Sequence, residues 1–177
     1  MKTSIILFLC ASLAIGESKI SIDASKSKIE ILGTSSLHDW ESSAEEFTIS
    51  GTIGTSVISD LNVEVQVSSI ESGKSIMDDK TQEALKSKEF PKIIFNASEL
   101  DLAGGKVSGP GTLTIAGASR SFQINAKAIN QPNDNLLIKG EAKLKMSDFG
   151  VDPPTAMFGT LTTGDEVTIQ YEILLTN

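Results

Sequence analysis

The residue types of a nucleophilic triad stand close together around one histidine. His38 is the only histidine of the 177-residue chain, and it lies beside Asp39 and shortly after Ser35 and Ser36. A Ser-His-Asp triad requires that the carboxylate orients the imidazole ring. Neighbouring side chains of an extended segment point to opposite faces, so Asp39 cannot orient His38 there. We therefore predict that the chain is not an enzyme.

Two other interpretations of this segment stay open. His38, Asp39 and Trp40 form either a polar turn with a packed indole, or a cluster at the mouth of a barrel that hydrogen-bonds the head group of a ligand. The first interpretation needs no ligand, whereas the second needs a cavity beside the turn.

Metal and phosphate chemistry lack the residues that they need. A zinc site uses three or four nitrogen, sulfur or carboxylate ligands, but the chain has a single histidine and a single cysteine, Cys10. No calcium-binding loop of the helix-loop-helix type is present. Gly109, Pro110 and Gly111 resemble a piece of a phosphate-binding loop, yet the residues that follow predict a strand and not a helix. We expect no metal and no cofactor.

The charge of the chain excludes further classes of partner. Its 15 basic and 23 acidic residues give a formal net charge of -8. Nucleic-acid binding needs clustered lysines or arginines, which the chain lacks. An anionic membrane surface would repel the chain for the same reason. We therefore expect neither a nucleic-acid partner nor stable membrane insertion.

The first sixteen residues are typical of a secretory signal. An apolar stretch at residues 5–15 is too short to span a bilayer as a helix. Ala14 and Gly16 are small residues at the positions that a signal peptidase requires, so cleavage is expected before Glu17. The mature protein is then periplasmic or secreted. A lipoprotein signal that uses Cys10 is the alternative to this cleaved signal, but the preceding Leu9 is larger than lipidation sites prefer.

Residues 17–177 predict a single domain. The mature chain has no cysteine, so its stability depends on its core. About 160 residues suffice for one such core.

Apolar and polar residues alternate along residues 135–146, which is the pattern of a strand with one wet face. Similar runs recur at short spacing, and turn residues such as Gly104 and Gly105 separate them. The expected strands are residues 19–23, 28–35, 46–53, 60–69, 92–101, 106–115, 119–129, 135–146 and 166–176. Residues 76–88 predict a short surface helix, and residues 148–165 predict a long apolar loop. The chain is therefore all-β, an antiparallel meander that forms a barrel or a sandwich.

The size of the side chains on the apolar faces decides between a packed core and a cavity. Gly140 and Ala142 are small, as are Ala126 and Ala128 on an earlier strand. Small residues at lining positions leave room for a ligand inside a small barrel. An ordinary packed core without a ligand remains the alternative.

Five short motifs in order resemble the signatures of the bacterial YceI-like family. They are Ser69-Ile70-Glu71-Ser72-Gly73, Phe90-Pro91-Lys92-Ile93-Ile94-Phe95, Gly111-Thr112-Leu113-Thr114-Ile115-Ala116-Gly117, Asp148-Phe149-Gly150 and Gly164-Asp165-Glu166-Val167-Thr168-Ile169. The resemblance implies an extended, eight-stranded, antiparallel, lipocalin-like barrel with one short surface helix. It also implies an exported protein whose apolar tunnel holds a polyisoprenoid or an isoprenoid quinone. Some members of this family are dimers, so a homodimer is an open alternative.

The resulting hypothesis is a non-enzymatic carrier or sequestering protein for a long-chain isoprenoid lipid. The alternative is a ligand-free β-domain that binds another protein of the cell envelope. We expect the residues that line the ligand to include Val63, Val65, Phe95, Ile124, Ala126, Ile138, Ala142, Leu144, Met146, Val167, Ile169 and Tyr171. Phe149, Met157 and Phe158 are candidates for a flap over the mouth, and His38, Trp40 and Asp148 are candidates for the polar end.

Overall fold

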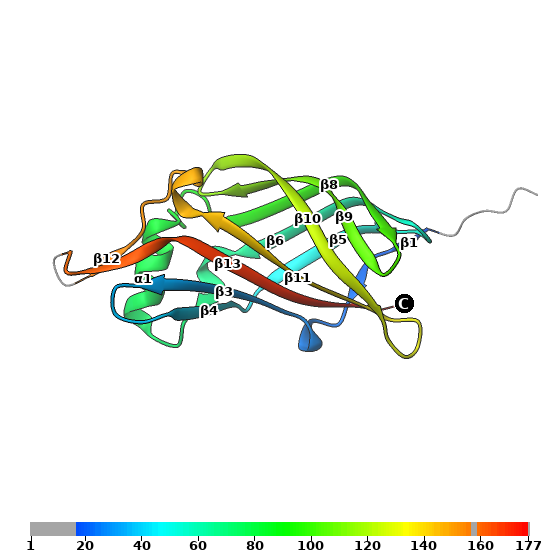
Figure 1. The fold of residues 1–177 in the computed structure, drawn as a ribbon, viewed down its shortest axis with the longest axis horizontal. Coiled ribbons are helices and arrows are strands. Elements are labelled where there is room, and N and C mark those ends of the chain that lie inside the picture. The colour runs from blue at the N-terminus through cyan, green and yellow to red at the C-terminus, as the bar shows by residue number, and fades with distance from the viewer. Residues whose placement is uncertain (1–16, 157–158, 177) are drawn as a thin grey trace, which may run out of the picture.

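A computed structural model describes residues 17–156 and 159–176 of the chain, and strands dominate it (Figure 1). The long strands are β3 (Lys28–Ser35), β5 (Phe47–Ile53), β6 (Val57–Gln66), β8 (Lys92–Ala103), β9 (Lys106–Ile115), β10 (Ala118–Asn130), β11 (Leu136–Lys145) and β13 (Leu161–Thr176). The short strands are β1 (Ser18–Lys19), β2 (Ser21–Ile22), β4 (Trp40–Ala44), β7 (Ile70–Glu71) and β12 (Thr155–Ala156). The predicted all-β class is confirmed. The predicted signal lies outside the described residues.

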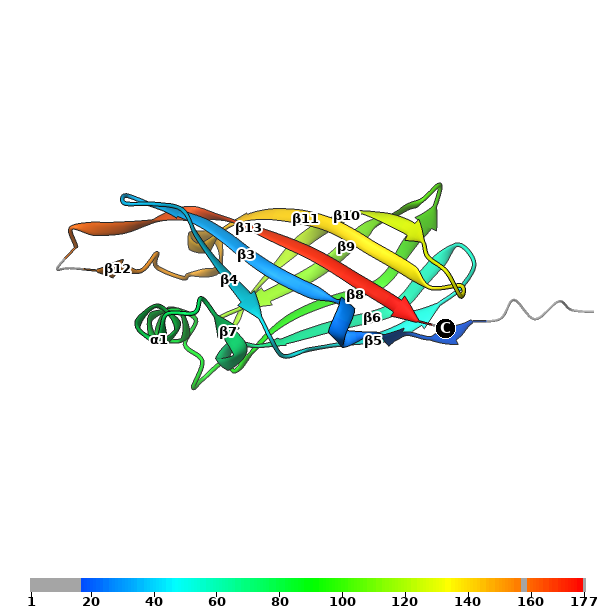
Figure 2. The same cartoon turned by 90° about the horizontal axis from the view of Figure 1, so that it is seen from below.

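The long strands form one antiparallel sheet that curls on itself (Figures 1 and 2). Neighbours follow the order β1-β5-β6-β8-β9-β10-β11-β13-β3-β4-β7. The N-terminal segment joins two distant strands, because β1 pairs with β5 while β2 pairs with β13. The architecture is thus the predicted lipocalin-like barrel, although β4 and the shorter strands add to the expected count.

Tight turns fix the register of the central hairpins. Gly104 and Gly105 both have positive φ, as do Ala116 and Gly117. Two consecutive residues with positive φ form the type of hairpin turn whose twist matches the twist of the paired strands. The predicted tight turn between β8 and β9 is therefore confirmed, and β9–β10 is a tight hairpin as well.

Two strands begin earlier than the sequence predicts. β6 starts at Val57, and Asp60 has a positive φ opposite the register shift near Gly51. This bulge breaks the alternation, which is why the sequence predicts a strand only from residue 60. β13 starts at Leu161, inside the segment that the sequence predicts as loop.

The predicted helix is present but shorter. Helix α1 (Ser75–Ala84) ends before Lys86, whose φ is +53°. Asp78 fixes its first turn, because its carboxylate accepts hydrogen bonds at 2.7 Å from both the backbone N–H and the hydroxyl of Ser72. Among the described residues, no helix is long and apolar enough to cross a membrane.

The wall between β10 and β11 is incomplete. These strands pair only from Ala126 to Asn130 against residues 136–140, although β10 pairs with β9 along residues 118–127. Figure 1 shows the two strands diverging toward the end of the barrel that carries α1. The 3-10 helix η3 (Met146–Phe149) contacts both strands and thus lies where they part.

Candidate ligand cavity

An apolar cavity of about 220 Å³ occupies the interior of the barrel. We call it the inner cavity. Of the residues that line it within the described chain, every one is aliphatic or aromatic, and Tyr171 alone carries a polar side-chain atom. The predicted lining residues that reach it are Val63, Val65, Phe95, Ile124, Ile138, Ala142, Leu144, Ile169 and Tyr171. The alternate side chains that the sequence predicts to face inward along these strands therefore do face the interior of the barrel.

Many inward side chains of β11 are only half-buried. Ile138, Ala142 and Leu144 alternate with exposed Lys139 and Lys143. The inward residues line the inner cavity, so part of their accessible surface faces an internal space. A packed core would bury such side chains almost completely. The interior of the barrel is thus not filled by its own side chains.

A second cavity of about 260 Å³, the outer cavity, continues the first toward α1. The two share Ile31, Ile70, Ile93, Ile115, Leu144 and Ile169 in their linings. The predicted residues Met146, Phe149 and Val167 line the outer cavity and not the inner one. Figure 2 shows α1, the β3–β4 turn and β12 at the same end of the molecule. The cavities together form a tunnel that runs toward that end.

Apart from Tyr171, the polar side chains of the described lining belong to the outer cavity. They are Ser35, His38, Trp40, Ser42, Lys80, Thr81, Thr155, Thr162 and Thr163. Lys80 is the one cation among the lining residues that the structure describes. An amphiphile in this tunnel therefore meets most of the hydrogen-bonding groups, and the positive charge of Lys80, toward α1.

The β3–β4 turn holds His38 and Trp40 in fixed positions. The hydroxyl of Ser35 donates to the carbonyl oxygen of His38 at 2.7 Å. His38 Nδ1 lies 2.6 Å from the carbonyl oxygen of Asp39, so Nδ1 carries the hydrogen and Nε2 is left for another partner. Trp40 Nε1 donates to the carbonyl oxygen of Thr34 at 3.0 Å. The indole is packed as the first interpretation expects, and both side chains line the outer cavity as the second requires.

Two predicted residues, Ala126 and Asp148, line neither cavity. Ala126 is 6% exposed and belongs to a core cluster with Leu100 and Val107. Asp148 is exposed and absent from both linings. Phe149 is 4% exposed and packs against Ile115. Phe149 therefore anchors η3 from within the lining of the outer cavity.

Two further flap candidates, Met157 and Phe158, lie outside the described residues.

Interior rings occupy the space above glycines. A Cβ atom built on Gly140 would lie 2.6 Å from Cζ of Tyr171 and would also overlap its hydroxyl. The rings of Phe95 and Trp40 cover Gly111 and Gly33 in the same way. The expectation that Gly140 leaves open space is therefore wrong. Ala142, in contrast, lines open space.

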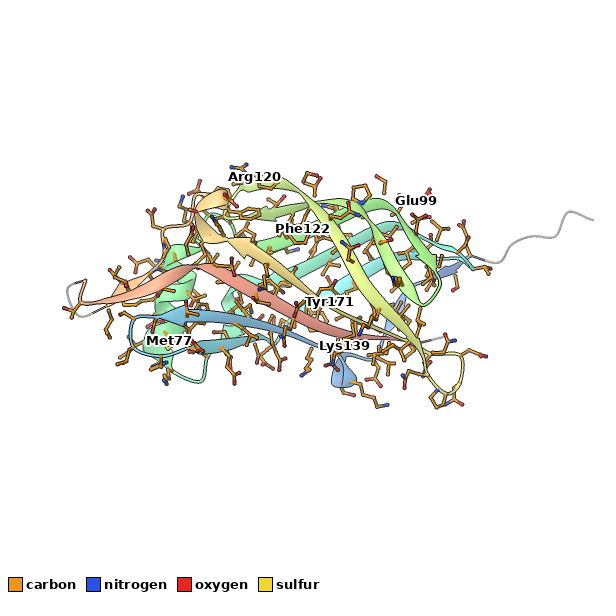
Figure 3. All side chains as sticks on the ribbon, viewed as in Figure 1. Met77, Glu99, Arg120, Phe122, Lys139 and Tyr171 are labelled. Atoms are coloured by element: carbon orange, nitrogen blue, oxygen red, sulfur yellow. The ribbon has the colours of Figure 1, made fainter. Side chains whose placement is uncertain are left out.

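Sequence reasoning missed the part of the lining that α1 supplies. Met77, Lys80, Thr81 and Ala84 follow helical spacing on one face, and all four line the outer cavity. Figure 3 shows Met77 at the α1 end of the barrel. The sequence predicts that the apolar residues Met77, Ala84 and Leu85 pack on the barrel and that the charges of the helix are solvated. The entry of Lys80 into the lining is therefore the part that the pattern did not indicate.

The described residues hold no group of three or more histidine, cysteine, aspartate or glutamate side chains that could bind a metal ion.

Comparison with known structures supports the fold. The Burkholderia cenocepacia protein BcnA has a TM-score of 0.74 at 20% identity, over 88% of this chain and 100% of its own. A polyisoprenoid binding domain from Saccharophagus degradans, implicated in plant cell wall breakdown, has a TM-score of 0.68 at 12% identity, over 89% and 97%. The YCEI protein of Campylobacter jejuni has a TM-score of 0.56 at 16% identity, over 100% and 94%. A search of curated proteins found no match.

The family model gives the assignment. The model described as YceI-like domain matches residues 21–175, which include every long strand. The match extends from Ser21 to Leu175, so it covers the barrel apart from β1 and Thr176, and the lining of both cavities apart from Ile20. The chain belongs to the YceI-like family.

Proposed function

We propose that the protein is a non-enzymatic carrier or sequestering protein, which binds a long-chain isoprenoid lipid in the continuous tunnel. The observation that carries this proposal is the apolar lining of the inner cavity, which opens into an outer cavity with polar groups. The two volumes, about 220 and 260 Å³, together fall within the range of about 300–1,000 Å³ that is typical of small-molecule sites. The structural likeness to a polyisoprenoid binding domain supports the same class of ligand.

The energetics of an apolar site select long ligands. Each buried methylene contributes about 0.8 kcal/mol, while association costs about 4–15 kcal/mol. A ligand must therefore bury roughly 5 to 20 carbon atoms before it gains any net affinity. Micromolar affinity needs about 8 kcal/mol more, or about ten further carbons. A chain of several isoprene units meets this requirement, and a short metabolite does not.

The polar groups of the outer cavity suit the end of such a ligand that reaches the mouth. Thr81, Thr162 and Thr163 offer hydroxyls, and Lys80 offers a charge. A phosphate can use Lys80, whereas a neutral head group can use the hydroxyls. Both polyprenyl phosphates and isoprenoid quinones are therefore candidate ligands.

Export forms part of the proposal. The pattern of residues 1–16 supports a cleaved signal, and the ligand would then be taken up in the periplasm or outside the cell. No step of this function requires a covalent reaction, a metal or a cofactor.

The test is the lipid content of the mature protein. The full chain is expressed with its own leader in its own host, purified without detergent and extracted with organic solvent for mass spectrometry. A single isoprenoid lipid near one per protein is expected. The extracted protein should also gain thermal stability when a polyprenyl phosphate or an isoprenoid quinone is added, because ligands that bind the folded state stabilise it.

The opposite result has a clear meaning. Protein without lipid, and without stabilisation by either added probe, would contradict the carrier function. It would favour the alternative of a ligand-free domain that binds another envelope protein.

A further inference from the structure

Two large apolar side chains are exposed at the α1 end of the tunnel. Leu37, in the turn between β3 and β4, is 66% exposed, and Ile76, in the first turn of α1, is 74% exposed. Among the large hydrophobic residues that the structure describes, the only other exposed one is Ile129, at 41%. Ile129 is the last residue but one of β10, and Figure 1 shows the β10–β11 turn at the opposite end of the barrel. The two most exposed apolar side chains of the described chain therefore share one end.

Both side chains border the outer cavity. Leu37 belongs to its lining. Ile76 does not, but it lies one helical turn before Lys80 and next to Met77, which both line this cavity. Figure 2 shows the β3–β4 turn and α1 on two sides of the same end, and Figure 3 shows Met77 there. Leu37 and Ile76 are thus part of the rim of the tunnel mouth, and we call them the apolar rim.

Local hydrogen bonds hold the apolar rim in place. The Ser35 hydroxyl oxygen accepts from the backbone N–H of Leu37 at 3.3 Å, and a backbone hydrogen bond of 2.9 Å ties the same turn to β13. The Asp78 carboxylate accepts two hydrogen bonds of 2.7 Å from Ser72 and thereby fixes the first turn of α1, which carries Ile76. Binding at the rim therefore needs little ordering of these segments, which lowers its entropic cost.

The small size of the apolar rim distinguishes a bilayer from a protein partner. A stable protein interface buries about 800 Å² on each partner and involves about 20–30 residues of each. The rim has two apolar side chains, and its exposed neighbours Ser36, Asp39 and Asp79 are polar. Fluid acyl chains close around single side chains, so a bilayer needs no matching surface. The rim thus fits a lipid surface better than a second copy of the chain.

The charges beside the rim indicate which lipid surface fits. Asp39, Asp79 and Lys74 are exposed beside the apolar rim, so both signs are present. The whole chain has a formal net charge of -8, and an anionic bilayer attracts cationic segments but repels such a chain. A zwitterionic head group carries a phosphate and an ammonium group, which offer partners to both signs. The complementary surface is therefore zwitterionic.

We propose that the apolar rim inserts into the surface of a zwitterionic bilayer and docks the tunnel mouth on it. A ligand chain then passes between bilayer and tunnel without crossing water; this route rests on the proposed function, whereas docking itself does not. Transfer of each rim side chain out of water strengthens binding about 5- to 30-fold. Docking by two such side chains is weak and reversible, which agrees with the expectation of no stable membrane insertion.

The test is flotation of the mature protein, expressed with its own leader, with vesicles of phosphatidylcholine. Leu37→Gln and Ile76→Gln should each weaken binding about 5- to 30-fold, and the double variant should no longer float. Ile129→Gln is the matched control, since it removes an exposed isoleucine from the opposite end, and it should bind as the wild type does. All these residues are exposed, so circular dichroism should give unchanged melting temperatures.

Two further measurements test the kind of surface and the route. Replacing part of the phosphatidylcholine with phosphatidylglycerol should weaken docking at low salt, and added salt should restore it, because salt screens the repulsion. Ile76 lines neither cavity, so Ile76→Gln separates docking from ligand binding. The variant should take up a fluorescent polyprenyl lipid from vesicles about 5- to 30-fold more slowly, while the amount bound at equilibrium stays the same.

The possible failures point to different parts of the reasoning. A wild type that does not float with phosphatidylcholine vesicles would overturn docking, while copurified isoprenoid would still support the proposed function. Tighter binding to vesicles with phosphatidylglycerol, or an equal loss in Ile129→Gln, would refute the role of the apolar rim on a zwitterionic surface. A dimer that Leu37→Gln dissociates in light scattering would assign the rim to a second copy of the chain instead. Docking without uptake of any polyprenyl lipid would contradict the proposed function and leave docking intact.

Discussion

Filling the inner cavity should abolish lipid binding while the barrel stays folded. Ala142 lines the inner cavity on β11, and it lies beyond the last residue of β11 that pairs with β10. Ala142→Trp adds about nine heavy atoms, which displace about as many carbons of a bound chain. At about 0.8 kcal/mol per methylene, the loss is ~7 kcal/mol, or about five orders of magnitude in affinity.

The assay measures the lipid that is copurified and the affinity for an isoprenoid quinone. Lys143→Trp is the matched control, because Lys143 is the next residue and is exposed on the outer face. Ala142→Trp should lose the lipid, and Lys143→Trp should retain it. Overpacking costs typically 1–3 kcal/mol, which would lower the melting temperature by roughly 2–12 °C, so circular dichroism shows whether the barrel has formed. Unchanged lipid content in a folded Ala142→Trp protein would refute the path through the inner cavity.

Three further predictions concern the mouth, the interior and the η3 segment. Lys80→Met should weaken the binding of a polyprenyl phosphate about tenfold, because a charge-assisted hydrogen bond is lost, and it should leave quinone binding unchanged. The control is Lys88→Met, since Lys88 is exposed on the surface. Equal losses of affinity in both variants would contradict a role for Lys80. Gly140→Ala forces the Tyr171 ring away from β11, so the free energy of unfolding, measured in denaturant, should fall by about 1–3 kcal/mol. An unchanged midpoint of the denaturant transition would mean that the ring does not lie above Gly140. Hydrogen bonds from the Ser147 hydroxyl and N–H hold the pKa of the Asp165 carboxyl below its ordinary value of 3.8. The stability that these hydrogen bonds give the folded state is therefore complete above pH 3.8 and is lost as the pH falls through the lower folded pKa. The difference in melting temperature between wild type and Asp165→Asn should shrink over that pH range, and a constant difference would contradict a role for these hydrogen bonds.

Local alternation predicted the strands well and their ends poorly. Residues 106–115 are β9 without a change at either end, because the run is uniform and tight turns limit it. β4 was not predicted, since Trp40–Ala44 contains polar and small residues without alternation. It forms because β3 offers a partner along Gly33 to Glu30. Pairing with a neighbouring strand, which a local pattern cannot show, decided this element.

The candidate site divides in a similar way. The inward parity of β11 and β13 was correct, so Ala142, Leu144, Ile169 and Tyr171 face the interior as expected. The same pattern could not tell that Ala126 is covered by core neighbours while Ala142 faces open space. That difference depends on which side chains stand opposite, and these come from distant strands.

The sequence by itself determined the all-β class, the hairpin turns and the faces of the long strands, because each of these depends on residues close together in the chain. Family motifs in the sequence also indicated the kind of barrel. Only the tertiary structure decided that Tyr171 occupies the space above Gly140 and that Lys80 of α1 enters the outer cavity. It also decided that β10 is not paired with β11 on the N-terminal side of Ala126. Each of these depends on the curvature of the curled sheet, which brings together strands and a helix that lie far apart in the chain.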